Sequence, residues 1–496
     1  MNSIPFAIIG TGPAAQFTFE GLVNSGVKIE EITLFEAGTK LDLDKNFKEV
    51  LSKKLPIEIE SRNLQFGGTS NTWTGLCSIF DKDEINLFKN DDTWKIVFED
   101  IQKYYKLLVN KFNFPKIEIK EDFLFDSSIK FKFRKFITIK KLLNIVRLNS
   151  IESRTKTSHQ LLNFQKKKDS FLLSFKNLNS NENYNVTCQK LIIACGGLEN
   201  IRIILDSFNG KEFSYDKVGR YFTNHPKFLF GRVTFNVYSN TKEFEVLFKN
   251  GFVNYFGISL CNSKSKSTQL NPYVRFEPEF SWNNDFLTNF LISVFNKLKF
   301  AFFSSRVKNF KTFFKDKSSK ILNIKNIINE QINFLPIMKL LFYKLKFYKP
   351  YTKTYNLRNY LEMEPKWENR VTIEKLDQLP SKIIVEYEIG ESELNSITDL
   401  HRELKKCFKS IDAKFETNLS KVEMNEFVAD ASHHCGGTIL GANKFNSVVD
   451  KNLELHDYKG CYVVGSSVFP TSGSVNPTYT IAAMGYRLGN YLSSKH

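Results

Sequence analysis

The sequence lacks several features that would assign it to particular classes of protein. Its seven cysteines are scattered, odd in number and form no CxxC pair, which argues against a disulfide framework and a structural zinc site. No uninterrupted run of roughly 18 to 20 apolar residues indicates a transmembrane helix. The first residues pass directly from an apolar segment into a glycine turn, without the charged region of a signal peptide. These absences predict a reduced, cytoplasmic protein, either free or attached to a membrane surface.

The composition predicts a folded protein larger than one ordinary core. A chain of 496 residues favours two domains, and its apolar fraction of 42% is that of a soluble globular protein. The net charge of +17 would suit a nucleic-acid-binding protein, but the excess is local. Residues 281–350 contain 13 Lys and Arg against 3 Asp and Glu. This local excess argues against a nucleic acid as the general partner.

The N-terminal residues carry the pattern of a dinucleotide-binding unit. Residues 4–9 are predicted to form a buried strand, the following residues to about 25 a helix, and residues 32–36 a second strand. The glycines between strand and helix permit a tight turn close to a pyrophosphate, and an acidic residue at the end of the second strand can accept hydrogen bonds from a ribose. The pattern predicts cofactor contacts at Gly10, Gly12, Pro13, Ala14, Ala15 and Glu36. It does not distinguish FAD from NAD.

A second glycine-rich segment, residues 67–75, contains small and hydroxylated residues beside a tryptophan. Such residues can approach a flat ring closely, although a plain surface loop would have a similar composition. The predicted cofactor contacts here are Gly67, Gly68, Thr69, Ser70, Asn71 and Trp73.

The densest chemistry is C-terminal. His433 and His434 precede Cys435 and a flexible glycine pair, and residues 465–478 follow as a run rich in Gly, Ser and Pro. A His–Cys cluster could bind a metal, but no second cluster has ligand spacing, so no metal site is predicted. Two hydrogen-bonded structural histidines are the simpler alternative.

Six segments occur in a recognisable order: 10–15, 67–75, 191–205, 219–226, 368–371 and 465–480. In this order the sequence resembles the glucose–methanol–choline (GMC) family of FAD-dependent oxidoreductases, closest in motif style to its sugar-oxidising members. The resemblance implies FAD as cofactor and an alcohol or sugar as substrate. It also implies cofactor contacts at Gly196, Gly465, Ser466, Asn476, Pro477 and Thr478.

The resemblance implies catalytic roles as well. His433 corresponds to the family histidine that faces the flavin and takes the hydroxyl proton, and Asn476 to the partner that binds the same substrate oxygen. His434 is the alternative base. His225 is expected to have a structural or flavin-domain role.

Two departures from the family pattern affect these expectations. Some sugar-oxidising relatives bind FAD covalently through a histidine in the flavin-side loop, but Thr72 stands at that position, so non-covalent FAD is expected. Residues 439–440 are Ile-Leu where many relatives have Arg-Met.

The basic segment at about 281–350 has no family motif, so nothing about the substrate is carried over from it. Its mixture of Phe, Leu, Ile and Lys suits an ordinary amphipathic covering helix, contact with an anionic membrane, or reception of an acidic or phosphorylated glycan. The sequence alone leaves these three interpretations open.

The expected fold is α/β, with a discontinuous Rossmann-like FAD-binding domain and an α+β substrate domain built on a largely antiparallel sheet. Residues 1–80, 185–226 and 430–496 are assigned to the first, and residues 81–184 and 227–429 to the second. The expected reaction is oxidation of a CH–OH group with oxygen, a quinone or a redox protein as electron acceptor. Alternatives are a flavin-dependent lyase or isomerase, and a membrane- or polyanion-binding protein with a non-catalytic flavin.

Overall fold

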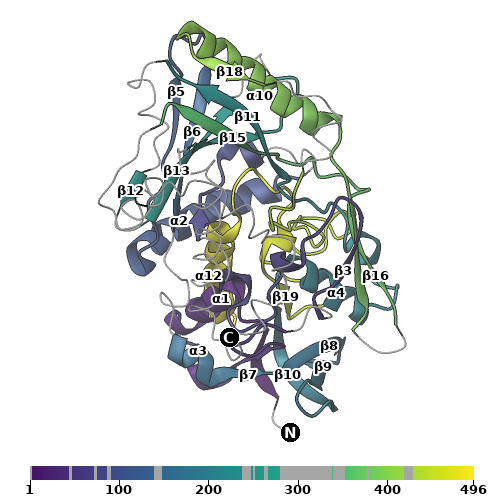
Figure 1. Ribbon diagram of the computed structural model, residues 1–496. Helices are drawn as coiled ribbons and strands as arrows, with labels where there is room; N and C mark the ends of the chain where they lie inside the picture. The colour runs from purple at the N-terminus through teal and green to yellow at the C-terminus, as the bar shows by residue number, and fades with distance from the viewer. Residues whose placement is uncertain are drawn as a thin grey trace, which may run out of the picture.

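The structure, a computed structural model, describes most of the chain and forms three sheets with covering helices (Figure 1). The described residues are 3–43, 47–71, 75–85, 91–138, 148–236, 247–249, 252–261, 266–279, 338, 352–376, 380–417 and 428–496. The basic segment at 281–350, except residue 338, therefore lies outside the described residues, as do Thr72 and Trp73. In the described regions, no helix combines the length and the apolar composition needed to cross a membrane.

A seven-stranded sheet contains the predicted dinucleotide-binding unit. Its centre is parallel: β1 pairs with β2 on one side and β10 on the other, and β19 runs parallel to β10 on its remaining edge. Segments far apart in the sequence thus share one sheet, which confirms the predicted α/β class and discontinuous assembly. In spatial order the strands are β7 (Thr155–Thr157), β2 (Ile32–Glu36), β1 (Ile4–Ile9), β10 (Asn183–Ile193), β9 (Phe171–Asn177) and β8 (His159–Lys166), with β19 (Cys461–Val463) beside β10.

Residues 155–177, which the sequence analysis placed in the substrate domain, supply three strands to this sheet. The reason is the length of β10. Its last residues pair with β1 and β19, whereas its first six pair antiparallel with β9, which continues into β8. The boundary expected at residue 184 therefore falls inside a continuous sheet.

Two glycine-containing helices, α1 (Pro13–Asn24) and α12 (Thr478–Ser493), pack against each other beside this sheet (Figure 1). Their backbones approach so closely that a Cβ on Gly485 would lie 2.7 Å from the carbonyl oxygen of Ala14. This contact fixes the N-terminus of α12 relative to the turn that precedes α1. Among the described residues, three further helices lie near this half: α2 (Thr93–Phe112), α3 (Leu148–Arg154) and α4 (Gly197–Ser207).

A nine-stranded sheet lies at the opposite end of the molecule, covered by α10 (Glu391–Ser410) (Figure 1). All its pairings are antiparallel, as expected for the substrate domain. Apolar residues of α10 recur every three or four positions and enter the same core as the sheet, for example Ile397 and Leu404 beside Leu357. The strands in spatial order are β18 (Lys414–Glu416), β11 (Lys227–Thr234), β15 (Thr354–Tyr360), β14 (Tyr273–Pro278), β13 (Phe252–Leu260), β6 (Lys130–Thr138) and β4 (Leu76–Cys77), with β12 (Leu247–Lys249) beside β13 and β5 (Ile119–Phe123) beside β6.

A small third sheet joins β3 (Val50–Lys54) to β17 (Lys382–Tyr387) in parallel and β17 to β16 (Arg370–Glu374) antiparallel. The N-terminal segment thereby contacts a region more than 300 residues away in sequence.

Candidate functional site

A cavity of about 580 Å³ extends from the glycine turn after β1 to the antiparallel sheet. Its size lies within the range of small-molecule and cofactor sites. The lining combines N-terminal, central and C-terminal segments, so it exists only in the folded chain. Fifteen of the residues predicted from the sequence line it: Gly10, Gly12, Pro13, Ala14, Glu36, Gly68, Thr69, Ser70, Gly196, His433, Gly465, Ser466, Asn476, Pro477 and Thr478.

Three further predicted residues do not line the cavity. Ala15 is fully buried in the core. Gly67 donates its N–H to the hydroxyl of Thr11 at 2.9 Å. The exposed amide of Asn71 donates to the carbonyl oxygen of Phe66 at 2.7 Å. These residues shape the turns next to the cavity rather than its wall.

The glycine turn gives the dinucleotide end its form. Gly10 has a φ of +101°, and a Cβ there would lie 2.5 Å from the carbonyl oxygen of Ala194. Gly12 is the N-cap of α1, and no side chain caps this helix end. The first N–H groups of α1 and its positive dipole end are therefore available to an anion such as a pyrophosphate.

Glu36 stands at the end of β2, where a ribose-binding carboxylate is expected. Its carboxylate accepts hydrogen bonds from the Thr11 hydroxyl at 2.7 Å and the Gly38 N–H at 3.0 Å. Burial raises the pKa of Glu36 to about 7, and these hydrogen bonds oppose the shift. Further donors, such as the hydroxyls of a ribose, would favour its ionised form.

An unsatisfied acceptor lies in the same part of the cavity. The side-chain oxygen of Gln160 is buried, and no described residue donates a hydrogen bond to it. Gln160 and the adjacent His159 line the cavity from strand β8. This strand follows β7, which pairs with β2 at Glu36. Buried acceptors are rarely left without a donor, so a ligand amino group is a suitable partner. The residues present therefore fit an adenine dinucleotide.

Asn200, on α4, joins the segments that form the floor of the cavity. Its side chain accepts a hydrogen bond from the Cys195 N–H at 2.7 Å and donates to the carbonyl oxygen of Val464 at 3.2 Å and the hydroxyl of Ser467 at 3.0 Å. The side chain is fully buried. It thereby ties the end of β10 to the turn after β19.

His433 is held by a network around its backbone. Ser432, immediately before it, has a left-handed φ of +62°, a conformation that costs a non-glycine residue about 1 kcal/mol or more. Asp430 supports this turn by accepting hydrogen bonds from the Ser432 N–H at 2.6 Å and the Asn224 amide at 2.7 Å. The His433 N–H in turn donates to Asn224 at 3.3 Å.

A chain of hydrogen bonds fixes the tautomers of two histidines. The carbonyl oxygen of Gly473 can only accept, so His225 donates its Nε2–H to it, at 2.6 Å. The burial that lowers the pKa of His225 to about 4 keeps this ring neutral, and its Nδ1 is then an acceptor. His433 accordingly donates its Nδ1–H to His225 Nδ1, at 2.9 Å. The other ring nitrogen of His433, Nε2, therefore carries no hydrogen and has a basic lone pair.

Asn476 approaches that lone pair, with its Nδ2 2.9 Å from His433 Nε2. Both residues line the cavity. Burial is the main cause that holds the pKa of His433 well below its ordinary value, and the charge of Lys227 adds to it, against an opposing effect of Asp430. His433 is thus a neutral base beside an amide donor, inside a cavity that continues to the dinucleotide turn.

The two neighbouring histidines are in different environments. His434 Nε2 lies 3.3 Å from Asp430 Oδ2, and the His434 carbonyl oxygen accepts a hydrogen bond from the Ser466 hydroxyl at 2.5 Å. Burial opposes ionisation of Asp430. The charge of His434 and the hydrogen bonds from His434, Asn224 and the Ser432 N–H outweigh this effect and lower the pKa of Asp430. His434 therefore anchors a carboxylate, whereas the basic Nε2 of His433 faces the amide of Asn476 in the cavity.

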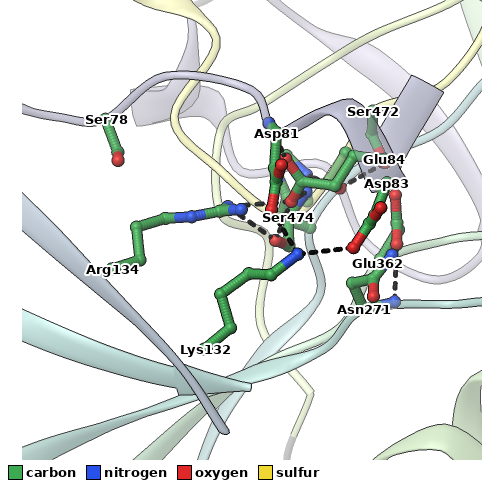
Figure 2. Close-up of polar contacts among 12 residues, drawn as sticks. Ser78, Asp81, Asp83, Glu84, Lys132, Arg134, Asn271, Glu362, Ser472 and Ser474 are labelled. Atoms are coloured by element: carbon green, nitrogen blue, oxygen red, sulfur yellow. Dashed lines mark hydrogen bonds and ion pairs between the residues drawn. The ribbon is translucent and has the colours of Figure 1, made fainter. Parts of the chain in front are cut away.

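A buried cluster of charged side chains holds the loop that carries Gly473 (Figure 2). Arg134 Nη1 donates to Glu84 Oε1 at 2.8 Å and to the Ser474 hydroxyl at 2.9 Å, and the Ser474 N–H donates to the same Glu84 oxygen at 3.0 Å. Lys132 pairs with Asp81 and, at 2.8 Å, with Asp83. Because Gly473 precedes Ser474, the cluster fixes the carbonyl that determines the tautomer of His225.

Sequence reasoning missed several residues of the site. A structural or flavin-domain role was expected for His225, but its contact with His433 was not foreseen. Sequence reasoning also missed the cavity-lining residues Thr11, Gln160, Lys227, Arg275, Arg358 and Tyr360. Lys227 directly follows the Asn-His-Pro segment, which was a usable signal. The others depend on strand pairing, which the sequence does not show.

Comparisons with known proteins relate parts of the sequence to oxidoreductases. Residues 365–485 match the sequence model of the family described as GMC oxidoreductase. The large subunit of fructose dehydrogenase from Gluconobacter japonicus is 31% identical over 103 residues, which are 21% of this chain and 18% of that protein. Cholesterol oxidase from Acinetobacter baumannii is 31% identical over 80 residues, 16% of this chain and 14% of that protein. These alignments span less than a fifth of either relative.

Three solved structures share the fold over the whole chain. Pyridoxine 4-oxidase from Mesorbium loti superposes with a TM-score of 0.59 at 12% identity, with all of both chains covered. An FAD-dependent oxidoreductase from Chaetomium thermophilum gives 0.58 at 13% identity, again with all of both chains covered. A fungal aryl-alcohol oxidase gives 0.57 at 12% identity, covering 100% of this chain and 99% of the other.

Proposed function

We propose that the chain, whose residues 365–485 match the GMC oxidoreductase family model, is an FAD-dependent oxidoreductase that oxidises a CH–OH group to a carbonyl. The observation that carries the proposal is the pairing of His433 Nε2 with Asn476 Nδ2, 2.9 Å apart, in a cavity continuous with the glycine turn. A base and an oxygen-binding amide at one end of a dinucleotide-sized cavity suit hydride removal from an alcohol.

FAD fits the residues that line the dinucleotide end. The N-terminus of α1 would bind its pyrophosphate, Glu36 its ribose and Gln160 its adenine amino group. When bound, FAD supplies the acceptor for the hydride that leaves the substrate carbon. Non-covalent attachment is part of the proposal, since Thr72 stands where some relatives carry the attaching histidine.

The protein residues handle the proton and the oxygen. His433 Nε2 takes the proton from the substrate hydroxyl, and Asn476 donates a hydrogen bond to the same oxygen. His225 accepts the Nδ1–H of His433 throughout, so the ring that gains the proton keeps its orientation. Loss of the proton from oxygen and of the hydride from carbon leaves the carbonyl product.

Several parts of the proposal rest on the sequence. These are a small alcohol or carbohydrate as substrate, a cytoplasmic location, and an anionic membrane surface as candidate contact for the segment at 281–350. The electron acceptor would be oxygen, a quinone or a redox protein.

The function is tested by the anaerobic visible spectrum of the purified protein with a panel of sugars and alcohols. The flavin bands are expected to bleach with a substrate and to return when an acceptor is added. A yellow protein that no alcohol bleaches would contradict alcohol oxidation and favour a reaction without net oxidation. A colourless protein that takes up no FAD would contradict the cofactor itself.

The pH dependence of flavin reduction provides a second prediction. His433 acts as a base only when unprotonated, and its lowered pKa keeps it unprotonated at more acidic pH than an ordinary imidazole. The rate of anaerobic reduction is therefore expected to stay level as the pH falls to about 6.5 and to decline only below it. Stopped-flow absorbance between about pH 5 and about pH 9 measures this profile. A decline centred above the ordinary imidazole value would argue against His433 as the base.

A further inference from the structure

The wall of the cavity on the antiparallel sheet carries a group of cationic side chains. Lys227 on β11 lies opposite Tyr360 on β15, and Arg275 on β14 lies opposite Arg358 on β15. Arg358 and Tyr360 are two positions apart on β15, so their side chains point to the same face of the sheet. Arg275 and Lys227, which lie directly opposite them, point to that face as well. All four line the cavity. We call Lys227, Arg275 and Arg358 the cationic wall.

The two arginines share a single carboxylate. Glu277 accepts from Arg358 Nε at 2.7 Å and Nη2 at 3.0 Å, and from Arg275 Nε at 3.2 Å. The Arg275 guanidinium also lies 5.5 Å from the centre of the Tyr360 ring, which is stacked on Tyr273. The arginines are therefore held in place before any ligand arrives.

Lys227 adds a third positively charged group to the cationic wall. No described carboxylate forms an ion pair with it, and it is half-buried at the cavity surface. The acidic residues among the described lining are Glu36, Glu60 and Glu199, and Glu199 is paired with Arg62 and Arg202. The described lining residues that lie on the antiparallel sheet include three cations and no carboxylate.

Lys227 is also close to the reacting groups. It follows His225 by two residues, and its charge adds to burial in lowering the pKa of His433. An anion bound at Lys227 would reduce this repulsion and make His433 a stronger base when substrate is present. The cationic wall and the base would then act on the same molecule.

We propose that the substrate is an alcohol that carries an anionic group, a carboxylate or a phosphate ester, and that Lys227 with Arg275 and Arg358 binds this group. The inference rests on the proposed function and names its substrate class. Guanidinium and ammonium groups both bind carboxylates and phosphates through charge-assisted hydrogen bonds, so either anion matches the wall.

The test compares three polyols that differ in charge: D-sorbitol, D-gluconate and D-sorbitol 6-phosphate. Their binding to the FAD-loaded protein is followed by the perturbation of the flavin spectrum at constant ionic strength, a readout that does not require turnover. At least one anion is expected to bind about tenfold or more tightly than sorbitol, and added salt is expected to reduce the difference. Which anion binds distinguishes a carboxylate from a phosphate ester.

The variant Lys227→Met keeps most of the side-chain stem and removes the charge, so the preference for the anion is expected to fall by about tenfold. Lys176→Met is the matched control, because Lys176 is also half-buried on a strand, β9, but does not line the cavity. It should leave the preference unchanged. Binding of both anions no tighter than that of sorbitol, including no binding of either, would overturn the inference, as would an unchanged preference in Lys227→Met.

Failure of the inference and failure of the proposed function give different results. Bleaching of the flavin by neutral alcohols without any preference for an anion would leave the function intact and refute the cationic wall. Tight binding of an anion with no bleaching by any alcohol would support the wall and refute the function.

Discussion

Replacing His433 with alanine is expected to slow flavin reduction by about 10²–10⁴-fold, the usual contribution of a general base. The protein should still bind FAD, because the cofactor contacts at Gly12 and Glu36 lie at the other end of the cavity. The loss has a specific cause: His433 offers an unprotonated Nε2 beside Asn476, and alanine offers no proton acceptor. Rapid mixing with substrate under anaerobic conditions measures the reduction rate directly.

His434→Gln is the matched control for this variant. Its imidazole is engaged with Asp430, and a glutamine amide can donate to the same carboxylate. We expect a much smaller change in the reduction rate. An equal or larger loss in His434→Gln, with His433→Ala near the wild-type rate, would assign the base to His434 instead.

The parts of the fold that the sequence predicted well are those determined by local patterns. The apolar run at 4–9 and the turn glycines at 10 and 12 define the strand and the helix start, and both appear where expected. The segment at 191–205 was singled out from the sequence, whereas the strand that enters it, β10, begins at residue 183. This early start of β10 is what brings β9 and β8 into the sheet. The pattern in the sequence cannot show it, because it depends on which neighbour β10 meets.

The site was predictable where a motif placed it and unpredictable where tertiary contacts did. His433 and Asn476 were identified from their segments, but their contact through Nε2 and Nδ2 joins residues 43 positions apart. The hydrogen bond that supports the Gly473 loop joins Ser474 to Glu84, two residues that are 390 positions apart. Buried ion pairs of this kind have no local signature, because each partner alone looks like an ordinary surface charge.

The cationic wall is another feature that local sequence patterns could not predict. Lys227 and Arg358 come from strands more than 120 positions apart, and only their pairing places both charges on one face. In the sequence, the excess of positive charge is concentrated at 281–350. In the structure, the cations that line the cavity come from other segments.

Gly10→Ala is expected to lower the free energy of unfolding by about 2–5 kcal/mol and to abolish FAD binding at ordinary concentrations. Two effects add. Residue 10 has a φ of +101°, which strains any side chain, and the new Cβ would lie 2.5 Å from the carbonyl oxygen of Ala194. The Gly10 N–H also joins the ends of β1 and β2 through the carbonyl oxygen of Phe35, at 2.8 Å. Relief of the clash would therefore disturb the centre of the parallel sheet. Chemical denaturation at a fixed FAD concentration and without FAD measures the loss.

Gly12→Ala separates steric exclusion of the cofactor from damage to the fold. Residue 12 has an ordinary φ of −71°, and a Cβ there would meet nothing within 4 Å of the protein. Because this residue lines the cavity, the methyl group would occupy space that a pyrophosphate needs. The free energy of unfolding of the variant should lie within about 1 kcal/mol of the wild-type value, because alanine is a poorer N-cap than glycine. The variant should nevertheless bind FAD much more weakly. Wild-type FAD affinity in Gly12→Ala would show that the cofactor does not approach this turn. Wild-type stability in Gly10→Ala would show that the turn can accept a side chain at residue 10 without disturbing the sheet. The pair of substitutions, two residues apart, thus tests whether this turn acts through the sheet, through the cofactor or through both.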